Sequence, residues 1–426
     1  MILIFVIMLL LFAIGTPIAW SIALAATYYM FIATPVPLET MVQRMFGGID
    51  SFPFLAIPFF ILAGNLMNTG GITERLVRFA RVLVGSITGG LAHVVVVANM
   101  IMAGMSGSGA ADAAGSGAVL IPAMKRVGYS AAFSSAIVGA SGTIGPIIPP
   151  SIPLVIYGSL AGESIGRLLL GGAVPGVVMG LMLMAFVYVI AKRRHYPSEE
   201  RAAWKEIGTA TLRALPPMGL PVIILGGIIW GVMTPTESAA AGAAYAFILG
   251  FFVYKELRFS QLLAVLSESA LATAVIVIII SAAQPFGWVL TFNEAPLYVL
   301  GFFQRVHFST WQLLAIINII LLILGCFMEG TAIMVMSIPI LLPLLQAAHI
   351  DLVHFGVVMV LNLMIGTVTP PVGMIMYVVC ALGKVSIIEF AREAWPFILA
   401  LTLVLFLITY IPSLVVWLPN LLMPMK

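Results

Sequence analysis

The sequence predicts an all-α polytopic membrane protein made of two copies of one unit. Of its 426 residues, 62% are hydrophobic and 8% are charged, whereas ordinary soluble domains carry about 25% charged residues. Apolar runs longer than about 18 residues, the length at which a helix can span a bilayer, recur along the chain. Two of the apolar segments, 139–158 and 365–379, share a pattern of glycines around a Pro-Pro pair, and these two segments define the copies.

The first Pro-Pro segment, GASGTIGPIIPPSIPLVIYG, occupies residues 139–158. Proline has no N–H and its ring displaces the carbonyl four residues earlier, so Pro149 and Pro150 break the helix. The carbonyls left free are those of Gly145 and Pro146. A bare carbonyl in hydrocarbon is costly, so it must be satisfied by protein, water or an ion. A helix broken at membrane depth is typical of the binding site of a transporter.

A second segment, IGTVTPPVGMIMYVV at residues 365–379, repeats the pattern of the first. Five matches of glycines and prolines at one spacing are hard to attribute to shared apolar composition. We therefore interpret the chain as two copies of a hairpin followed by a broken helix. The residues that match at a spacing of 221 are Gly104 with Gly325, Pro122 with Pro343, Gly145 with Gly366, Pro149 with Pro370, and Pro150 with Pro371.

The N-terminal region, residues 1–50, is predicted to be scaffold. Residues 2–33 are expected to form the first span, kinked at Gly15 and Pro17. Residues 38–50 are short and amphipathic, as in a helix that lies against lipid at the membrane interface.

The first copy is expected to occupy residues 51–191 and to begin with a short span. Arg75, Arg78 and Arg81 then line one face of a helix. This spacing favours an interfacial helix whose charged ends reach the headgroups; a contact surface for a partner is the alternative.

A hairpin is predicted over 103–124, followed by a broken helix over 131–160 and a closing span. Small residues in this hairpin indicate either tight helix packing or a non-helical tip. The Gly-Ser alternation at 106–109 would loosen a helix, which favours a tip that presents the hydroxyls of Ser106 and Ser108.

Between the copies lies a polar loop, residues 192–213, which carries six of the chain's 19 basic residues. The positive-inside rule therefore places it in the cytoplasm. Residues 214–260 are predicted to be connecting scaffold spans. One helix there is expected to begin at Thr236, where Glu237 suits the positive helix end.

The second copy is assigned to residues 261–426, with a hairpin over 324–346 and a broken helix over 352–381. Gln284-Pro285 is expected to interrupt its first apolar run, and its last span is placed at 395–418. Glu329 occupies the hairpin tip. An ionisable residue there is a functional candidate, unless the tip simply reaches water.

Several chemistries are missing from the sequence. The glycine run at 104–117 is not followed by Gly-Lys-Ser/Thr, so it is no P-loop and ATP is not expected to drive this chain. No convergent set of acidic, histidine and nucleophilic residues indicates an enzyme. No lysine-rich tail indicates nucleic acid. A channel could also contain broken helices, but an internal repeat favours alternating access.

Five strings make the chain similar to the large membrane subunit of the TRAP (tripartite ATP-independent periplasmic) transporters. They fall between about residues 50 and 380: ILAGNLMNTGGITERLV, AGMSGSGAADAAGSGAVLIPAMKRVGY, GPIIPPSIPLVIYG, TPTESAAAGAAYA and GTVTPPVG. The second copy departs from the first because Glu329 stands where the first copy has Ser108, so the two sites need not be equivalent.

The resemblance implies an inverted-repeat, elevator-type transporter in the bacterial inner membrane. Such a protein couples sodium entry to uptake of an organic acid such as sialic acid or a C4-dicarboxylate. A periplasmic substrate-binding protein would deliver the acid, and a small four-helix membrane subunit would pack beside the chain. A stand-alone sodium/carboxylate symporter of similar design is the alternative.

Sodium and substrate are expected at the breaks, because free carbonyls suit a hard cation and helix N-termini suit a carboxylate. The first sodium site is predicted at the carbonyls of Gly145, Ile148 and Pro150, closed by Ser106. Its twin is predicted at Gly366, Thr369 and Pro371, closed by the tip that begins at Gly325. The substrate is expected between the tips. The candidates for its contacts are Ser108, Ser151, Glu329 and Thr331.

Overall fold

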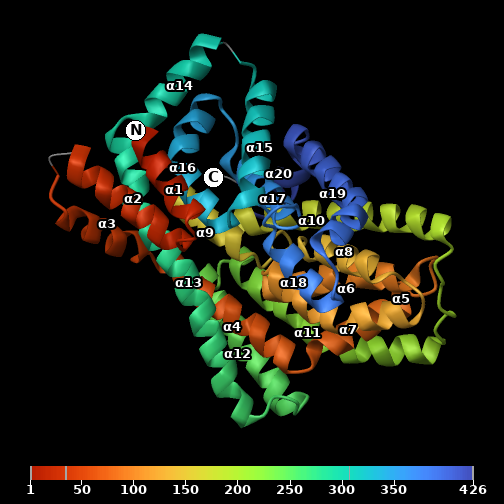
Figure 1. Cartoon of the computed structure of the whole chain (residues 1–426). Helices are drawn as coiled ribbons and strands as arrows, with labels where there is room; N and C mark the ends of the chain where they lie inside the picture. Colours follow the sequence, from red (N-terminus) through yellow and green to blue (C-terminus); the bar gives the residue numbers. More distant parts are fainter. Residues whose placement is uncertain (1, 34–35, 307, 425–426) are drawn as a thin grey trace.

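The computed structural model describes residues 2–33, 36–306 and 308–424. Every regular element in these ranges is a helix, and eight of the helices are long and apolar enough to cross a membrane. In Figure 1, α1, α2 and α3 (red) lie on one side of the molecule and α5, α6 and α7 (orange) on the other. The all-α membrane fold predicted from the composition is confirmed.

Two runs of helices follow one plan: an opening helix, a short amphipathic helix, two hairpin arms, two halves of a broken helix and a long closing helix. The first run is α4 (Ala56–Thr69), α5 (Ile72–Val84), α6 (Gly90–Ser106), α7 (Gly109–Arg126), α8 (Ala131–Gly142), α9 (Ile152–Ala161) and α10 (Ile165–Arg194). The second run is α13 (Phe259–Phe292), α14 (Ala295–Val306), α15 (Thr310–Phe327), α16 (Gly330–Ala347), α17 (Leu352–Gly366), α18 (Met374–Gly383) and α19 (Ile387–Tyr410). Helices α7 and α16 begin 221 residues apart, as do α8 and α17.

The remaining helices flank these two runs. They are α1 (Ile2–Ala13), α2 (Ile18–Ala33), α3 (Glu39–Ile49), η1 (Phe52–Leu55), α11 (Trp204–Ile229), α12 (Pro235–Ile248), η2 (Leu249–Val253) and α20 (Ser413–Leu422). Helix α12 packs on α4, and α2 and α3 pack on α13 (Figure 1). The opening helices of the two copies, α4 and α13, therefore each pack against flanking helices.

The two copies interlock at their broken helices. Helix α18 of the second copy packs against α7 and α8 of the first, while α9 of the first copy packs against α16 and α17 of the second. The Tyr157 hydroxyl of α9 donates to the Leu352 carbonyl at the start of α17, at 2.9 Å. This exchange brings both hairpin tips and both breaks into one region.

The hairpins are longer than the sequence indicates. The first comprises α6 and α7, residues 90–126 rather than 103–124, and the second comprises α15 and α16, residues 310–347 rather than 324–346. Small and charged residues mark only the tips. The arms are apolar helices of 17 or 18 residues, and their composition does not distinguish them from other spans.

Three further predictions of element bounds are wrong. Residues 2–33 form two helices that pack on each other, joined by a turn in which Gly15 has φ +85°, rather than one kinked span. Helix α13 passes through Pro285 without a break. The loop predicted over 192–213 is irregular only at 195–203, because α10 and α11 extend into it.

Two helices also begin earlier than expected. Thr234 caps α12 in a capping box with Glu237, whereas the sequence pointed to Thr236. Helix α19 begins at Ile387 rather than near 395, and a capping box formed by Ser386 and Glu389 starts it. Each helix carries a glutamate in its first turn, and the apolar pattern assigns such a turn to the preceding loop.

The arginines of α5 pair with acids of the same chain. Arg81 lies 2.7 Å from Glu199, and Arg78 lies 3.7 Å from Glu206. Glu199 belongs to the polar connection between α10 and α11, and Glu206 lies in the first turn of α11. These pairs account for the charged face of α5 without a partner protein.

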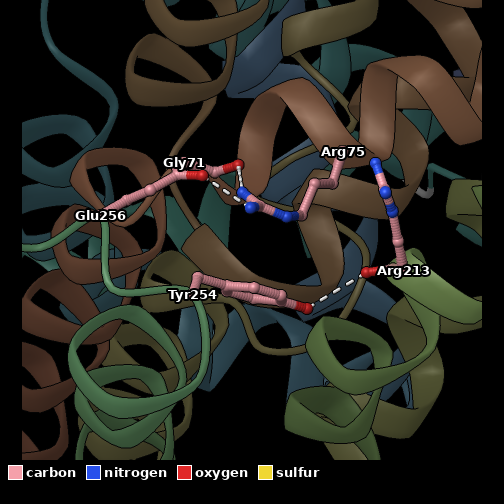
Figure 2. A network of polar contacts seen from close by, with 5 residues as sticks. All are labelled: Gly71, Arg75, Arg213, Tyr254 and Glu256. Carbon is pink, nitrogen blue, oxygen red and sulfur yellow. Dashed lines mark hydrogen bonds and ion pairs between the residues drawn. The ribbon is translucent and has the colours of Figure 1, made fainter.

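Arg75 makes the most extensive of these contacts (Figure 2). Its guanidinium donates to the Gly71 carbonyl and to Glu256, both at 2.6 Å. It also lies 4.1 Å above the ring of Tyr254, whose hydroxyl donates to the Arg213 carbonyl at 3.1 Å. One side chain therefore ties the turn between α4 and α5 to the segments that flank α12.

Replacing Arg75 by alanine is expected to destabilise the protein by about 1–2 kcal/mol. The variant loses charged hydrogen bonds and a cation–π contact, but the ion pair is partly exposed and contributes little by itself. Thermal unfolding of the detergent-purified chain measures this loss. Arg78→Ala is the control one turn along the same helix, and a similar loss in both variants would contradict the role of the network.

Candidate functional site

The first hairpin tip lies directly on the first break. Gly107 at the tip has φ +61°, and a Cβ there would come within 2.7 Å of the Pro150 carbonyl oxygen. Only glycine allows both this left-handed conformation and this close approach. The hydroxyl of Ser106 is buried, donates to Asp112 Oδ1 at 2.6 Å, and accepts from the Ser108 N–H at 3.3 Å.

Asp112 is a member of this site that the predicted ligand set did not include. Its side chain is fully buried, and its Oδ2 accepts no hydrogen bond within the part of the chain that the structure describes. A Cβ on Gly145 would come within 2.4 Å of that oxygen, so the carboxylate lies over the break. The sequence signal was present, because Asp112 is the only charge in the small-residue run from 103 to 117.

The predicted carbonyls at the first break divide into two groups. Those of Gly145, Ile148 and Pro150 accept no backbone hydrogen bond among the described residues. The Pro146 carbonyl, expected to be free, instead accepts a hydrogen bond from the Ser151 hydroxyl. The break therefore gathers unpaired carbonyls beside Ser106 and the Asp112 carboxylate.

Ser151 does not occupy the position expected of a substrate contact. Its side chain is fully buried, and its hydroxyl also accepts from the Leu154 N–H at 3.2 Å as the N-cap of α9. It is absent from the lining of the cavity between the tips. A serine before a helix serves capping as readily as binding, and only the packing separates the two roles.

The second hairpin approaches the second break through a pair of glycines. A Cβ on Gly366 would come within 2.5 Å of the carbonyl group of Gly325. The Val372 N–H donates to the Cys326 carbonyl at 3.1 Å, which joins the two segments by a backbone bond. The tip and the break thus touch through their main chains.

The predicted twin site differs from the first in its carbonyls. Gly366 O accepts from the Thr369 N–H at 3.1 Å, and Pro371 O accepts from the Tyr377 hydroxyl at 3.4 Å. Of the three predicted ligands, the Thr369 carbonyl alone accepts no hydrogen bond from a described residue. No buried carboxylate corresponds to Asp112 here, because position 333 is isoleucine.

Behind each break, an amide joins a hairpin arm to the first half of the broken helix. In the first copy, Asn99 of α6 donates to the Ser141 hydroxyl at 2.6 Å. In the second copy, Asn362 of α17 donates to Asn318 Oδ1 of α15 at 2.8 Å. Ser141 and Asn362 are 221 residues apart, so the repeat extends to these buried polar contacts, which the sequence predictions did not include.

A cavity of about 470 Å³ lies between the two tips and the two breaks. Ser108, Glu329 and Thr331, three of the four candidates for substrate contact, line it. The first residues of α7, α9, α16 and α18 also border it. Four helix N-termini therefore converge on one space, and each favours negative charge.

The two tips present different groups to this cavity. Glu329 caps α16, accepting from the Ala332 N–H at 3.0 Å and from the Thr331 hydroxyl at 2.8 Å. Ser108 holds the same position before α7 but forms no side-chain cap bond. The N-terminus of α7 is therefore open, whereas that of α16 is already occupied by a carboxylate.

Two copies of a hairpin and a broken helix, meeting around a membrane cavity, define a secondary membrane transporter. The family profile of the tripartite ATP-independent periplasmic transporter, DctM component, matches residues 5–414. The chain belongs to this family. It is accordingly a multi-pass protein of the bacterial inner membrane and a transporter component rather than an enzyme.

Named relatives agree with this assignment over nearly their full length. The sialic acid TRAP transporter large permease protein SiaM of Vibrio cholerae is 40% identical, with 97% of this chain and 96% of the relative covered. The C4-dicarboxylate TRAP transporter large permease protein DctM of Pseudomonas aeruginosa is 39% identical, with 94% of each covered. Among solved structures, MtrF of Neisseria gonorrhoeae matches with a TM-score of 0.61 at 13% identity, covering 95% of this chain and 94% of that one, so it shares the fold.

Proposed function

We propose that the chain is the large permease of a sodium-coupled TRAP transporter that imports an organic acid by an elevator movement. The observation that carries the proposal is the cavity bordered by both tips, both breaks and four helix N-termini. The substrate carboxylate would bind at the open N-terminus of α7. The names of the relatives, which include sialic acid and C4-dicarboxylate permeases, support an organic acid as the substrate.

Sodium would bind at the first break, which offers the ligands that a hard cation prefers. Asp112 supplies a charge, Ser106 a hydroxyl, and Gly145, Ile148 and Pro150 supply carbonyls. A second ion would bind at the matching place in the second copy, near Thr369. An ion there would fix the tip against the break, and so give the cavity its shape only when sodium is bound.

The partners follow from family membership. A periplasmic substrate-binding protein would deliver the acid, and a small membrane subunit would pack against the flanking helices. The two copies interlock through α9 and α18, so the hairpins and broken helices would move as one body. The helices that pack against α13 or against each other would stay fixed in the membrane while that body moves. They are α2, α3, α4 and α12.

The Pro-Pro segments provide the test. Alanine at 149 restores an N–H that can donate to the free Gly145 carbonyl, and alanine at 370 restores one that can extend α17 across the second break, so each substitution disturbs a proposed cation site. We expect Pro149→Ala and Pro370→Ala each to lower sodium-driven uptake about ten-fold or more in proteoliposomes that hold the complete transporter. Pro396→Ala, inside α19, is the matched control and should keep wild-type uptake.

The same proteoliposomes separate the proposal from its rival. Uptake that needs sodium, the binding protein and the small subunit together supports the tripartite transporter. Equal uptake with the chain alone would identify a stand-alone symporter. Uptake that runs equally well when potassium replaces sodium would contradict sodium coupling.

A further inference from the structure

The cavity between the tips has an unusual charge pattern for a protein that binds an anion. Among the residues that line it, the charged side chains are Glu268 and Glu329, and none is a lysine, arginine or histidine. The attraction for a carboxylate must therefore come from the helix N-termini. That attraction is local, because the effect of a helix terminus fades within about one turn.

Glu329 and Glu268 differ in how their charges are balanced. Glu329 accepts two hydrogen bonds at the start of α16, so the helix terminus offsets part of its charge. Glu268 is an exposed residue of α13, and no described residue forms an ion pair or hydrogen bond with it. Its carboxylate lines the cavity without a described partner to offset its charge.

Helix α13 forms the apolar wall that Glu268 interrupts. Leu271, Val275 and Ile279 face the cavity at helical spacing, and from Glu268 to Ile279 the helix covers roughly 16 Å. The neighbouring Ser269 accepts a hydrogen bond from the Asn65 amide of α4 at 2.9 Å, which fixes the rotation of α13 about its axis. Glu268 is therefore held on the cavity side.

We infer that this cavity selects a monocarboxylate with a hydroxylated, uncharged remainder, and that Glu268 is the residue that rejects a second negative charge. The inference rests on the proposed function, since it assumes that the cavity takes an organic acid. One carboxylate is received at α7. The remainder of the ligand then meets two acids and an apolar wall, where hydroxyl groups can donate to Glu268.

A dicarboxylate has no comparable place for its second charge. Within a cavity of about 470 Å³, that group would lie either beside Glu268 or Glu329 or against the apolar wall of α13. Like charges at such separations repel strongly where water is partly excluded. We expect the resulting preference to be about ten-fold or more between two acids of similar size.

Ligand-dependent thermal stabilisation of the purified full chain in sodium chloride provides the test, because it needs no binding protein to deliver the ligand. The two probes are gluconate, a hydroxylated monocarboxylate, and succinate, a dicarboxylate. Wild-type protein should be half-stabilised at a gluconate concentration about ten-fold or more below that for succinate. Glu268→Gln should lower the succinate concentration and reduce the ratio at least several-fold.

Glu163→Gln is the matched control, since Glu163 follows the C-terminal end of α9 whereas the N-terminal end borders the cavity. It should keep the wild-type ratio. A wild-type preference for succinate, or an unchanged ratio in Glu268→Gln, would overturn the inference while leaving an organic-acid transporter intact. If neither acid stabilises any variant in sodium, the inference is wrong, whereas the proposed function is refuted only by a complete transporter whose uptake does not need sodium.

Discussion

Replacement of Asp112 by asparagine is expected to abolish sodium-driven uptake while the protein still folds into the membrane. Asparagine keeps the shape of the side chain and can still accept from the Ser106 hydroxyl. It removes the only charge that the first break offers to a cation. Removing one partner of a buried charge pair costs about 3–5 kcal/mol, so sodium affinity should fall roughly a hundred-fold or more.

Two measurements together test this expectation. Sodium titration of thermal stability reports binding, and uptake into proteoliposomes reports coupling. Asp351→Asn is the matched control: Asp351 is an exposed N-cap of α17 that accepts from the His354 N–H at 2.8 Å, and asparagine caps equally well. A wild-type sodium midpoint in Asp112→Asn would remove Asp112 from the proposed site.

The second large effect is expected from Gly366→Ala. A Cβ at this position would lie 2.5 Å from the carbonyl carbon and oxygen of Gly325, and neither atom belongs to a side chain that could move aside. The second hairpin must then separate from the second break. We expect uptake to fall at least ten-fold and the free energy of unfolding to drop by about 1–3 kcal/mol, the usual cost of overpacking.

Gly208→Ala serves as the control for this substitution. Gly208 lies within α11, where an added Cβ meets nothing within 4 Å, so alanine should be neutral or slightly stabilising. Thermal unfolding and uptake are compared for both variants. If Gly366→Ala behaves like Gly208→Ala, the close approach of hairpin and break does not control transport.

The two breaks and the first tip were predictable from local causes, and the repeat at a spacing of 221 located the second tip. A Pro-Pro pair removes two backbone donors wherever it stands, and alternating glycine and serine weaken a helix without help from neighbours. The same logic fails at Pro285, which α13 accommodates, and at Pro216-Pro217, which lie inside the continuous helix α11. A proline pair therefore does not by itself determine a break, and the surrounding packing decides whether the helix continues.

Side-chain roles were less predictable, because they depend on which elements meet. Ser108, Glu329 and Thr331 do line the cavity, but Ser151 is a buried helix cap. The Gly-Ser pattern predicted a cation ligand at Ser106 but none at Asp112, six residues later. In the structure the two side chains are hydrogen-bonded. Glu268 lies far from both tips in sequence and carries no local signal at all.

By itself, the sequence determined a helical membrane protein with an internal repeat and two helices broken at Pro-Pro pairs. These features arise from composition, spacing and the covalent chemistry of proline, all of which act within a few residues. The tertiary structure alone decided that the copies exchange their broken helices, that Asp112 lies over the first break and that Glu268 faces the cavity. Those facts depend on the packing of segments up to hundreds of residues apart, which no local pattern encodes.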